Sequence, residues 1–234
     1  MENALRTVQA NGITLAYRTW GPDQAPDDAP PVVLLHCRGA DSTDWDRIAG
    51  PLSAARRVYA LDLRGHGRSD WPGTYTYESM RDDVLAFLTA LGIERTDLVG
   101  HSLGGAAAYL LAQQHPECVR RLVLEDVPAP FPLDPPRPPA ERPDGDLAFD
   151  WAMVLQTDEQ RNTPDPVWWE HMGRITMPTL LIGGGATSLI PQDHIAVLAD
   201  LLLDARLITI DAGHLVHETR PKEFLVAVEA FLGL

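Results

Sequence analysis

One serine in the chain has neighbours of the kind that make a serine reactive. Ser102 lies in Gly100–Gly104, which reads Gly-His-Ser-Leu-Gly and fits the pattern G-x-S-x-G. An apolar segment typical of a strand precedes it and a helical segment follows, and a tight turn between the two would expose the serine hydroxyl. The backbone N–H of Leu103, at the start of that helix, would point to where negative oxygen charge develops. The pattern predicts that Ser102 is a nucleophile.

A serine hydroxyl needs a base that removes its proton, and the chain has eight histidines. His214 is favoured because it follows a predicted strand near the C-terminus, and loops past strand ends form the site of an open α/β sheet. His36 opens a loop better suited to supplying backbone donors. His66 and His101 lie in turns where histidines are more often structural. His217 is expected to support the loop of His214.

The elements that must position these residues alternate between strands and helices. Short apolar or alternating runs predict strands, and amphipathic segments between them predict helices. The predicted strands are Leu5–Ala10, Ile13–Trp20, Val32–Leu35, Val58–Leu61, Asp97–Val99, Leu122–Asp126, Thr179–Ile182 and Arg206–Ile210. The predicted core helices are Asp44–Ala54, Tyr77–Leu91, Leu103–His115, Asp193–Leu203 and Lys222–Leu232. This order predicts an α/β fold, a mostly parallel twisted sheet with helices on both faces.

The alternation stops in a segment rich in proline and tryptophan. We expect residues 128–176 to form a short helical lid inserted into a core made of 1–127 and 177–234, because a long insertion in a compact α/β pattern is usually functional. Trp151 and Trp168 are expected to contact the substrate. The alternative is a linker with a few core-facing tryptophans. Helical pieces are predicted near Leu147–Thr157 and Pro166–Arg174.

Several motifs together resemble those of the α/β-hydrolase superfamily. They are Leu34–His36, Asp62–Ser69, Gly100–Gly105 and Ala212–His214, the last followed by Glu218 and Pro221. The resemblance extends over nearly the whole chain and favours the esterase, haloperoxidase-like and carbon–carbon-bond hydrolase branches. It implies that Ser102 is the nucleophile and His214 the base. It also implies that the backbone N–H of Arg38, beside that of Leu103, is the second donor to the oxyanion.

The chain departs from the family pattern just before this second donor. Family members usually have His-Gly where this chain has His36 and Cys37, and glycine eases a tight backbone path past the substrate. Cys37 carries a Cβ, so the loop is expected to be slightly altered. We expect Cys37, and His101 in the serine turn, to lie among the substrate-contacting residues. A catalytic thiol is less favoured, because no histidine is clearly arranged to activate it.

A second departure concerns the acid that should orient the histidine. Family members usually carry it in a loop Gly-x-x-Asp-x-x-Pro, and Ser188 occupies the acid position here. A hydroxyl can orient an imidazole but cannot stabilise an imidazolium as a carboxylate does. Some superfamily branches, including certain haloalkane dehalogenases, place the acid after the strand that here ends in Glu125 and Asp126. Asp126 is favoured at the strand edge, Glu125 is second and Asp193 third. The alternative is that the first two only position the lid.

These residues predict a serine hydrolase that acts on a carboxylic ester, lactone or thioester through an acyl-enzyme on Ser102. One alternative is a carbon–carbon-bond hydrolase or a cofactor-free haloperoxidase or perhydrolase. Another is a non-catalytic binding protein with a hydrolase fold, which the missing acid at Ser188 makes conceivable. Neither metal-ligand spacing nor a phosphate loop is found, so no cofactor and no metal are expected.

Length and charge narrow the class of partner. The 234 residues suit one domain, and 33 acidic against 19 basic residues give a formal net charge of −14. Such a surface repels nucleic acid and anionic membranes, so the expected partner is a small, partly apolar molecule. Two cysteines make no disulfide framework, and the first residues lack a signal-peptide pattern. We expect a cytoplasmic monomer or homodimer.

Overall fold

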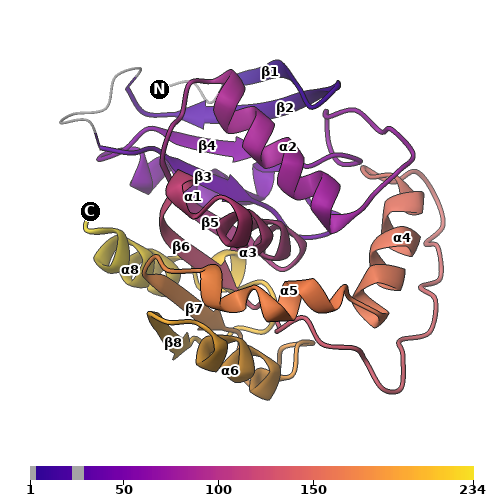
Figure 1. Ribbon diagram of the computed structural model, residues 1–234. Helices are drawn as coiled ribbons and strands as arrows, with labels where there is room; N and C mark the ends of the chain where they lie inside the picture. The colour runs from indigo at the N-terminus through magenta and orange to yellow at the C-terminus, as the bar shows by residue number, and fades with distance from the viewer. Residues whose placement is uncertain (1–3, 23–28) are drawn as a thin grey trace.

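Eight strands form one twisted sheet through the middle of the molecule, in the order β1-β2-β4-β3-β5-β6-β7-β8 (Figure 1). The computed structural model describes residues 4–22 and 29–234. The strands are β1 (Leu5–Ala10), β2 (Ile13–Trp20), β3 (Val32–Leu35), β4 (Val58–Leu61), β5 (Thr96–His101), β6 (Val119–Glu125), β7 (Thr179–Gly183) and β8 (Ala205–Thr209). From β4 to β8 all neighbours are parallel, and β2 pairs antiparallel with both β1 and β4. The predicted α/β fold with a mostly parallel sheet is confirmed.

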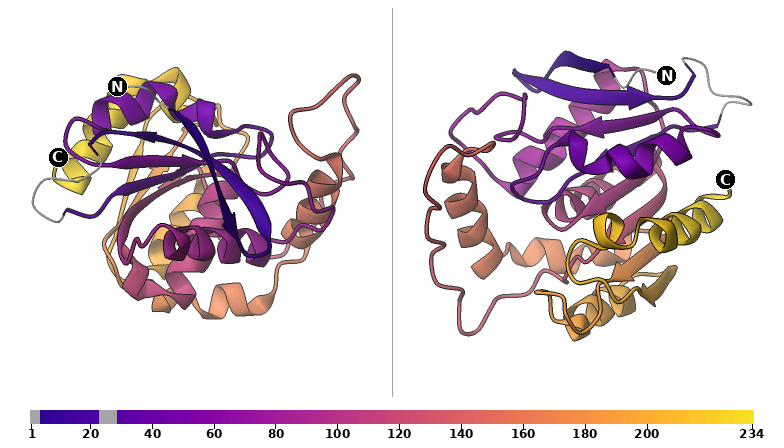
Figure 2. Two further views of the ribbon diagram at one scale, coloured as in Figure 1. Left: turned by 90° about the horizontal axis from the view of Figure 1, so that it is seen from above. Right: turned by 180° about the vertical axis from the view of Figure 1, so that it is seen from behind.

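Helices cover both faces of the sheet, because side chains alternate along each strand. On β3, Val33 and Leu35 pack into the core beneath α2, α3 and α6, while Val32 and Leu34 pack into the core beneath α1 and α8. The two further views show these layers from above and from behind (Figure 2). The helices are α1 (Asp46–Leu52), α2 (Tyr77–Ala90), α3 (Leu103–Gln114), α4 (Trp151–Asn162), α5 (Pro166–Glu170), α6 (Gln192–Leu201), α7 (Val216–Thr219) and α8 (Pro221–Leu232).

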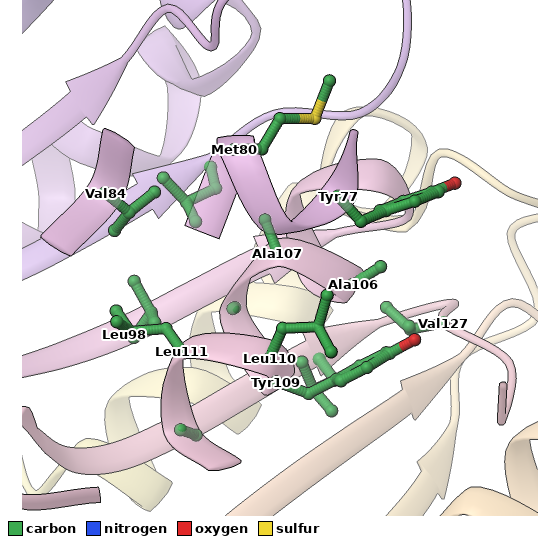
Figure 3. Packing of buried hydrophobic residues seen from close by; sticks show 14 of the residues in the cluster. Tyr77, Met80, Val84, Leu98, Ala106, Ala107, Tyr109, Leu110, Leu111 and Val127 are labelled. Atoms are coloured by element: carbon green, nitrogen blue, oxygen red, sulfur yellow. The ribbon is translucent and has the colours of Figure 1, made fainter. Parts of the chain in front are cut away.

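The contact between α2 and α3 builds one wall of the site. Met80 and Val84 of α2 belong to the same buried cluster as Ala107 and Leu111 of α3 (Figure 3). The small alanines on α3 let the two helices approach each other. This packing fixes the N-terminal end of α3, where the predicted nucleophile lies.

The segment 128–176 leaves the sheet after β6 and returns at β7. Its first part is irregular, α4 then lies beside the N-terminal end of α2, and α5 lies near the C-terminal end of α3, where Gln113 Nε2 donates to the Trp168 carbonyl at 2.7 Å (Figure 1). Helix α4 begins at Trp151, later than predicted, because the Asp150 side chain accepts a hydrogen bond from the Ala152 N–H and caps the helix there. The N–H of Tyr77 donates to Gln160 Oε1 at 2.9 Å, which ties α4 to the start of α2. That this segment acts as a lid stays a prediction.

The lengths of the helices also show whether any of them could cross a membrane. None of the helices in the described part of the chain combines the length and apolarity needed to cross a membrane.

Candidate active site

Ser102 lies on a sharp turn between β5 and α3. Its backbone has φ 49° and ψ −110°, a conformation that L-residues rarely adopt. The N–H of Ser102 donates to the Glu125 carbonyl at 3.0 Å, and the Ser102 carbonyl accepts from the Ala106 N–H at 2.9 Å. Strain of this kind persists only where surrounding bonds enforce it, and it gathers at functional sites.

Glycines around the serine allow strand and helix to approach. A Cβ on Gly100 would lie 2.6 Å from the Cα of Gly105, and a Cβ on Gly104 would lie 2.5 Å from the Leu35 carbonyl oxygen. Any side chain at these positions would force the helix away from the sheet. The glycine pattern therefore positions the N-terminus of α3, and with it the Leu103 N–H, beside Ser102.

His214 and Asp126 meet at the carboxyl edge of the sheet. The Nδ1 atom of His214 lies 2.6 Å from Asp126 Oδ2, although the two residues are 88 positions apart. The Asp126 carboxylate also accepts a hydrogen bond from the Gly184 N–H at 2.8 Å and one from the Ser188 hydroxyl. The backbone of Asp126 has φ 50°, which does not fit a strand, so Asp126 lies just past the end of β6. The strand thus ends at Glu125, one residue before its predicted end.

Burial raises the pKa of Asp126, but the hydrogen bonds from His214, Ser188 and Gly184 outweigh this effect and the net pKa is lowered. The carboxylate is therefore ionised at neutral pH, directly beside the imidazole. Ser188, which stands where the family usually has its acid, is a hydrogen-bond donor to this carboxylate. Sequence reasoning placed Ser188 at the right position but did not foresee this contact.

Glu125 faces away from His214 and forms a separate pair with His217. Its Oε2 lies 2.8 Å from His217 Nδ1, and the His217 N–H donates to Oε1 at 2.9 Å. The other ring nitrogen of His217 lies 3.4 Å from Asp44 Oδ2. Burial alone would lower the pKa of His217, but the charges of Glu125 and Asp44 raise it to about 10. The ring of Trp45 stacks on this imidazolium, with centroids 4.1 Å apart.

His101 is fully buried between these two systems and borders neither of the cavities described below. Its ring centroid lies 4.7 Å from that of His214 and 5.3 Å from that of His217. Burial lowers its pKa to about 4, so the ring is neutral. His101 was expected to contact the substrate, but in this position its side chain is buried away from both cavities. The ring packs behind His214 instead.

Two clusters contain residue types that bind metals, namely Cys37 with Asp44 and His101, and His101 with Glu125 and His217. A raised pKa keeps both nitrogens of His217 protonated, and an imidazolium has no lone pair for a metal. The pKa of the Cys37 thiol is raised to about 12, chiefly by burial, so this ligand is also in its protonated form. The absence of a metal and a cofactor stays a prediction.

Ser102 and His214 border one cavity of about 520 Å³. The same cavity is lined by Leu103, Arg38 and Cys37, so both predicted oxyanion donors lie on the wall that holds the serine. Cys37 is not among the described residues with positive φ, and Gly39 takes the left-handed position in this loop instead, at φ 84°. The loop therefore accommodates a cysteine where the family usually has glycine.

A second cavity, of about 370 Å³, also borders Ser102 and is lined largely by residues of the segment 128–176. Its wall contains Trp168 and many apolar groups, whereas Trp151 borders neither cavity and packs against the core. Of the two tryptophans expected to contact the substrate, Trp168 borders a cavity beside Ser102 and Trp151 does not, and the substrate contact of Trp168 stays a prediction. Tyr77 of α2 and Tyr109 of α3 also line this cavity, and their hydroxyl ends point the same way (Figure 3).

Within residues 4–22 and 29–234, four residues border both cavities: Tyr77, Ser102, Arg137 and Arg161. The sequence analysis did not single out either arginine. Arg137 lies in an irregular, proline-rich stretch that has no periodicity, and Arg161 is one of several charged residues on α4. Only their positions in the folded chain reveal them.

Comparison with known proteins agrees with this architecture. A family model described as alpha/beta hydrolase fold matches residues 30–172. The sn-1-specific diacylglycerol lipase ABHD11 of Mus musculus is 27% identical over 249 residues, which cover 87% of this chain and 81% of that protein. The 2-hydroxymuconate semialdehyde hydrolase of Pseudomonas putida is 40% identical over 116 residues, 48% of this chain and 41% of that protein. The crystal structure of a hydrolase from Pseudomonas aeruginosa superposes with a TM-score of 0.83 at 27% identity, over 98% of each chain. The chain belongs to the α/β-hydrolase fold family, and it is a hydrolase enzyme.

Proposed function

We propose that the protein is a serine hydrolase that cleaves a carboxylic ester, lactone or thioester through an acyl-enzyme on Ser102. The observation that supports it most is the 2.6 Å contact between His214 Nδ1 and Asp126 Oδ2. With Nδ1 engaged by the carboxylate, Nε2 is the ring nitrogen available to the serine hydroxyl. Ser102 and His214 border the same cavity, as this reaction needs.

The proposed reaction has two steps. Ser102 Oγ attacks the carbonyl carbon while His214 Nε2 takes the hydroxyl proton, and the negative carbonyl oxygen is held by the N–H groups of Arg38 and Leu103. The bond to the leaving group then breaks, His214 protonates that group, and an acyl-enzyme remains. Water loses a proton to His214 and attacks this acyl group; the bond to Ser102 Oγ then breaks, His214 returns the proton to Oγ, and the carboxylic acid is released. Asp126 stabilises the imidazolium in both steps.

The test is hydrolysis of p-nitrophenyl esters from acetate to long acyl chains by the wild type and by Ser102→Ala. We expect the wild type to turn over at least the shorter esters and the variant to lose nearly all of this activity. A serine-directed phosphonate should label the wild type alone. A wild type that is neither active nor labelled would favour a binding protein with a hydrolase fold and overturn the proposal.

Carbon–carbon-bond hydrolysis is a second candidate, favoured by the 40% identity to the 2-hydroxymuconate semialdehyde hydrolase of Pseudomonas putida over 116 residues. That stretch covers less than half of each chain, so it is weak support for a shared substrate. The direct test is incubation with 2-hydroxymuconate semialdehyde. Its consumption by the wild type, in the absence of ester turnover, would make this the better assignment.

A further inference from the structure

Two arginines lie at the junction of the cavities, beside the nucleophile. Arg137 belongs to the irregular part of the segment 128–176 and Arg161 to the last turn of α4. Both border each of the two cavities, a property that, among the described residues, only Ser102 and Tyr77 share with them. A substrate bound at Ser102 therefore extends past these two guanidinium groups whichever cavity receives it.

Neither guanidinium is neutralised by an ion pair within the described part of the chain. Asn162 holds the backbone of Arg137 from both sides, with Arg137 N donating to Asn162 Oδ1 at 2.9 Å and Asn162 Nδ2 donating to the Arg137 carbonyl at 3.0 Å. The Nε atom of Arg161 is buried and has no hydrogen-bond partner. Half-buried cationic groups without partners are costly unless a ligand supplies one.

The nearby acidic residues do not neutralise the positive charge of the two arginines. Asp158 is engaged by Arg38, with 2.5 Å between Asp158 Oδ1 and Arg38 Nη1. Asp134 borders only the smaller cavity and is exposed to solvent. Burial lowers the pKa of Arg137 most, the charge of Arg161 lowers it further, and Asp158 opposes them with an effect smaller than that of Arg161 but larger than that of Arg38. The junction is therefore positively charged in a chain whose formal net charge is −14.

We propose that Arg137 and Arg161 bind a carboxylate or phosphate group carried by the substrate, at a distance from the bond that Ser102 attacks. The planar guanidinium donates paired hydrogen bonds that match both groups. Val127, Ala106 and Trp168 line the smaller cavity and suit an apolar portion of the same molecule. The substrate class is then an anionic ester, lactone or thioester with an apolar part. This inference rests on the proposed serine hydrolase function.

The experiment compares two esters of similar length, p-nitrophenyl butyrate and the mono-p-nitrophenyl ester of glutaric acid, which ends in a carboxylate. The proteins are the wild type, Arg137→Gln, Arg161→Gln, the double variant, and Arg142→Gln as control. Arg142 lies in the same segment, is exposed and borders neither cavity. We expect the wild type to prefer the anionic ester in kcat/KM. Each single change should lower the ratio of anionic to neutral kcat/KM by about tenfold, because a charge-assisted hydrogen bond is lost. Arg142→Gln should leave the ratio unchanged.

A wild type that hydrolyses the neutral ester equally well or better would overturn the anion site and leave the hydrolase intact. An equal fall of the ratio in Arg142→Gln would reduce the effect to overall charge and also overturn the site. Turnover of neither ester would count against the proposed function instead. In that case thermal stabilisation by glutarate or inorganic phosphate, lost in the double variant, tests the site without catalysis. Its absence would overturn the site, and the stronger of the two ligands identifies the preferred group.

Discussion

The backbone of Asp126 has a left-handed conformation that few L-residues adopt. Its φ of 50° turns the carboxylate away from β6 and toward the loops that follow β7 and β8. There it meets the Ser188 hydroxyl, at the position from which family members usually present an acid. His214 thus meets a carboxylate that follows β6, whereas family members usually carry the acid in the loop after β7. Position relative to the imidazole, and not position in the chain, decides the chemistry.

Replacement of this carboxylate tests its role. Asp126→Asn should lower kcat by about 10⁴-fold while the fold survives, because the amide cannot stabilise an imidazolium. The double variant Asp126→Asn/Ser188→Asp should regain at least about tenfold of that loss, since an acid at 188 approaches the same imidazole. The measurement is ester turnover with circular dichroism as a check of folding. Full activity in Asp126→Asn would show that this carboxylate is not the acid of the site.

Cys37 borders the cavity, yet burial raises the pKa of its thiol to about 12. Since the thiolate is the reactive form, iodoacetamide at pH 8 should react slowly with this residue and leave ester hydrolysis largely intact. Cys37→Ala should also retain the activity that depends on Ser102. Rapid inactivation that Cys37→Ala prevents would point to a catalytic thiol.

The crossing of α3 over the sheet depends on residues too small to separate the two elements. A Cβ on Gly105 would lie 2.3 Å from Val127 Cγ2 and 2.9 Å from the Gly100 carbonyl oxygen. Gly100 precedes the serine turn and Val127 follows β6, so a side chain at Gly105 would displace both the turn that holds Ser102 and the chain just before the segment 128–176. The elbow is therefore a property of the packed strand–helix pair as much as of the serine itself.

Gly105→Ala should destabilise the protein by about 1–3 kcal/mol through overpacking and lower kcat at the same time. Addition of Val127→Ala should recover part of the stability, because it removes the nearer of the two clashing atoms. Gly173→Ala is the matched control, since a Cβ there meets nothing within 4 Å. Denaturant unfolding and ester turnover measure the two effects. Equal stability of both alanine variants would contradict the close approach.

The molecule as a whole contains a buried ion pair whose titration should shape its stability. Burial raises the pKa of Glu125, but His101 and His217 together lower it to about 2, and the pKa of His217 is raised to about 10. The contribution of Glu125 is present above its unfolded pKa and lost as the pH falls toward 2. The contribution of His217 is complete below its unfolded pKa and lost as the pH rises through about 10. Both are fully present only between about pH 4.5 and pH 6.5.

The free energy of unfolding of the wild type should therefore exceed that of Glu125→Gln/His217→Gln most in this window. The difference should shrink as the pH rises from about 6.5 toward 10, where the folded imidazolium loses its proton. Denaturant unfolding across this range measures it. The control is Glu117→Gln/His115→Gln, an exposed pair at 3.4 Å that should contribute little. A difference that does not vary with pH would contradict the ion pair.

Local patterns in the sequence were sufficient for most of the architecture. Alternating apolar runs predicted the eight strands because each strand must bury one or both faces, and the glycines around Ser102 predicted the turn because close backbone approach excludes larger residues. The position of His214 past a C-terminal strand followed from the same logic. These features depend on residues near one another in the chain.

Tertiary structure decided what depends on distant residues. Glu125 and Asp126 are neighbours in sequence, and only the left-handed turn at Asp126 and the pairing of Glu125 with His217 send them to different histidines. Likewise, Arg137 has no distinguishing pattern, because an irregular proline-rich stretch has no period from which to read a facing side. Arg161 is one of several charged residues on α4, and nothing in the sequence separates it from the others. They border the same cavities as Ser102 only because the insertion folds back over the carboxyl edge of the sheet.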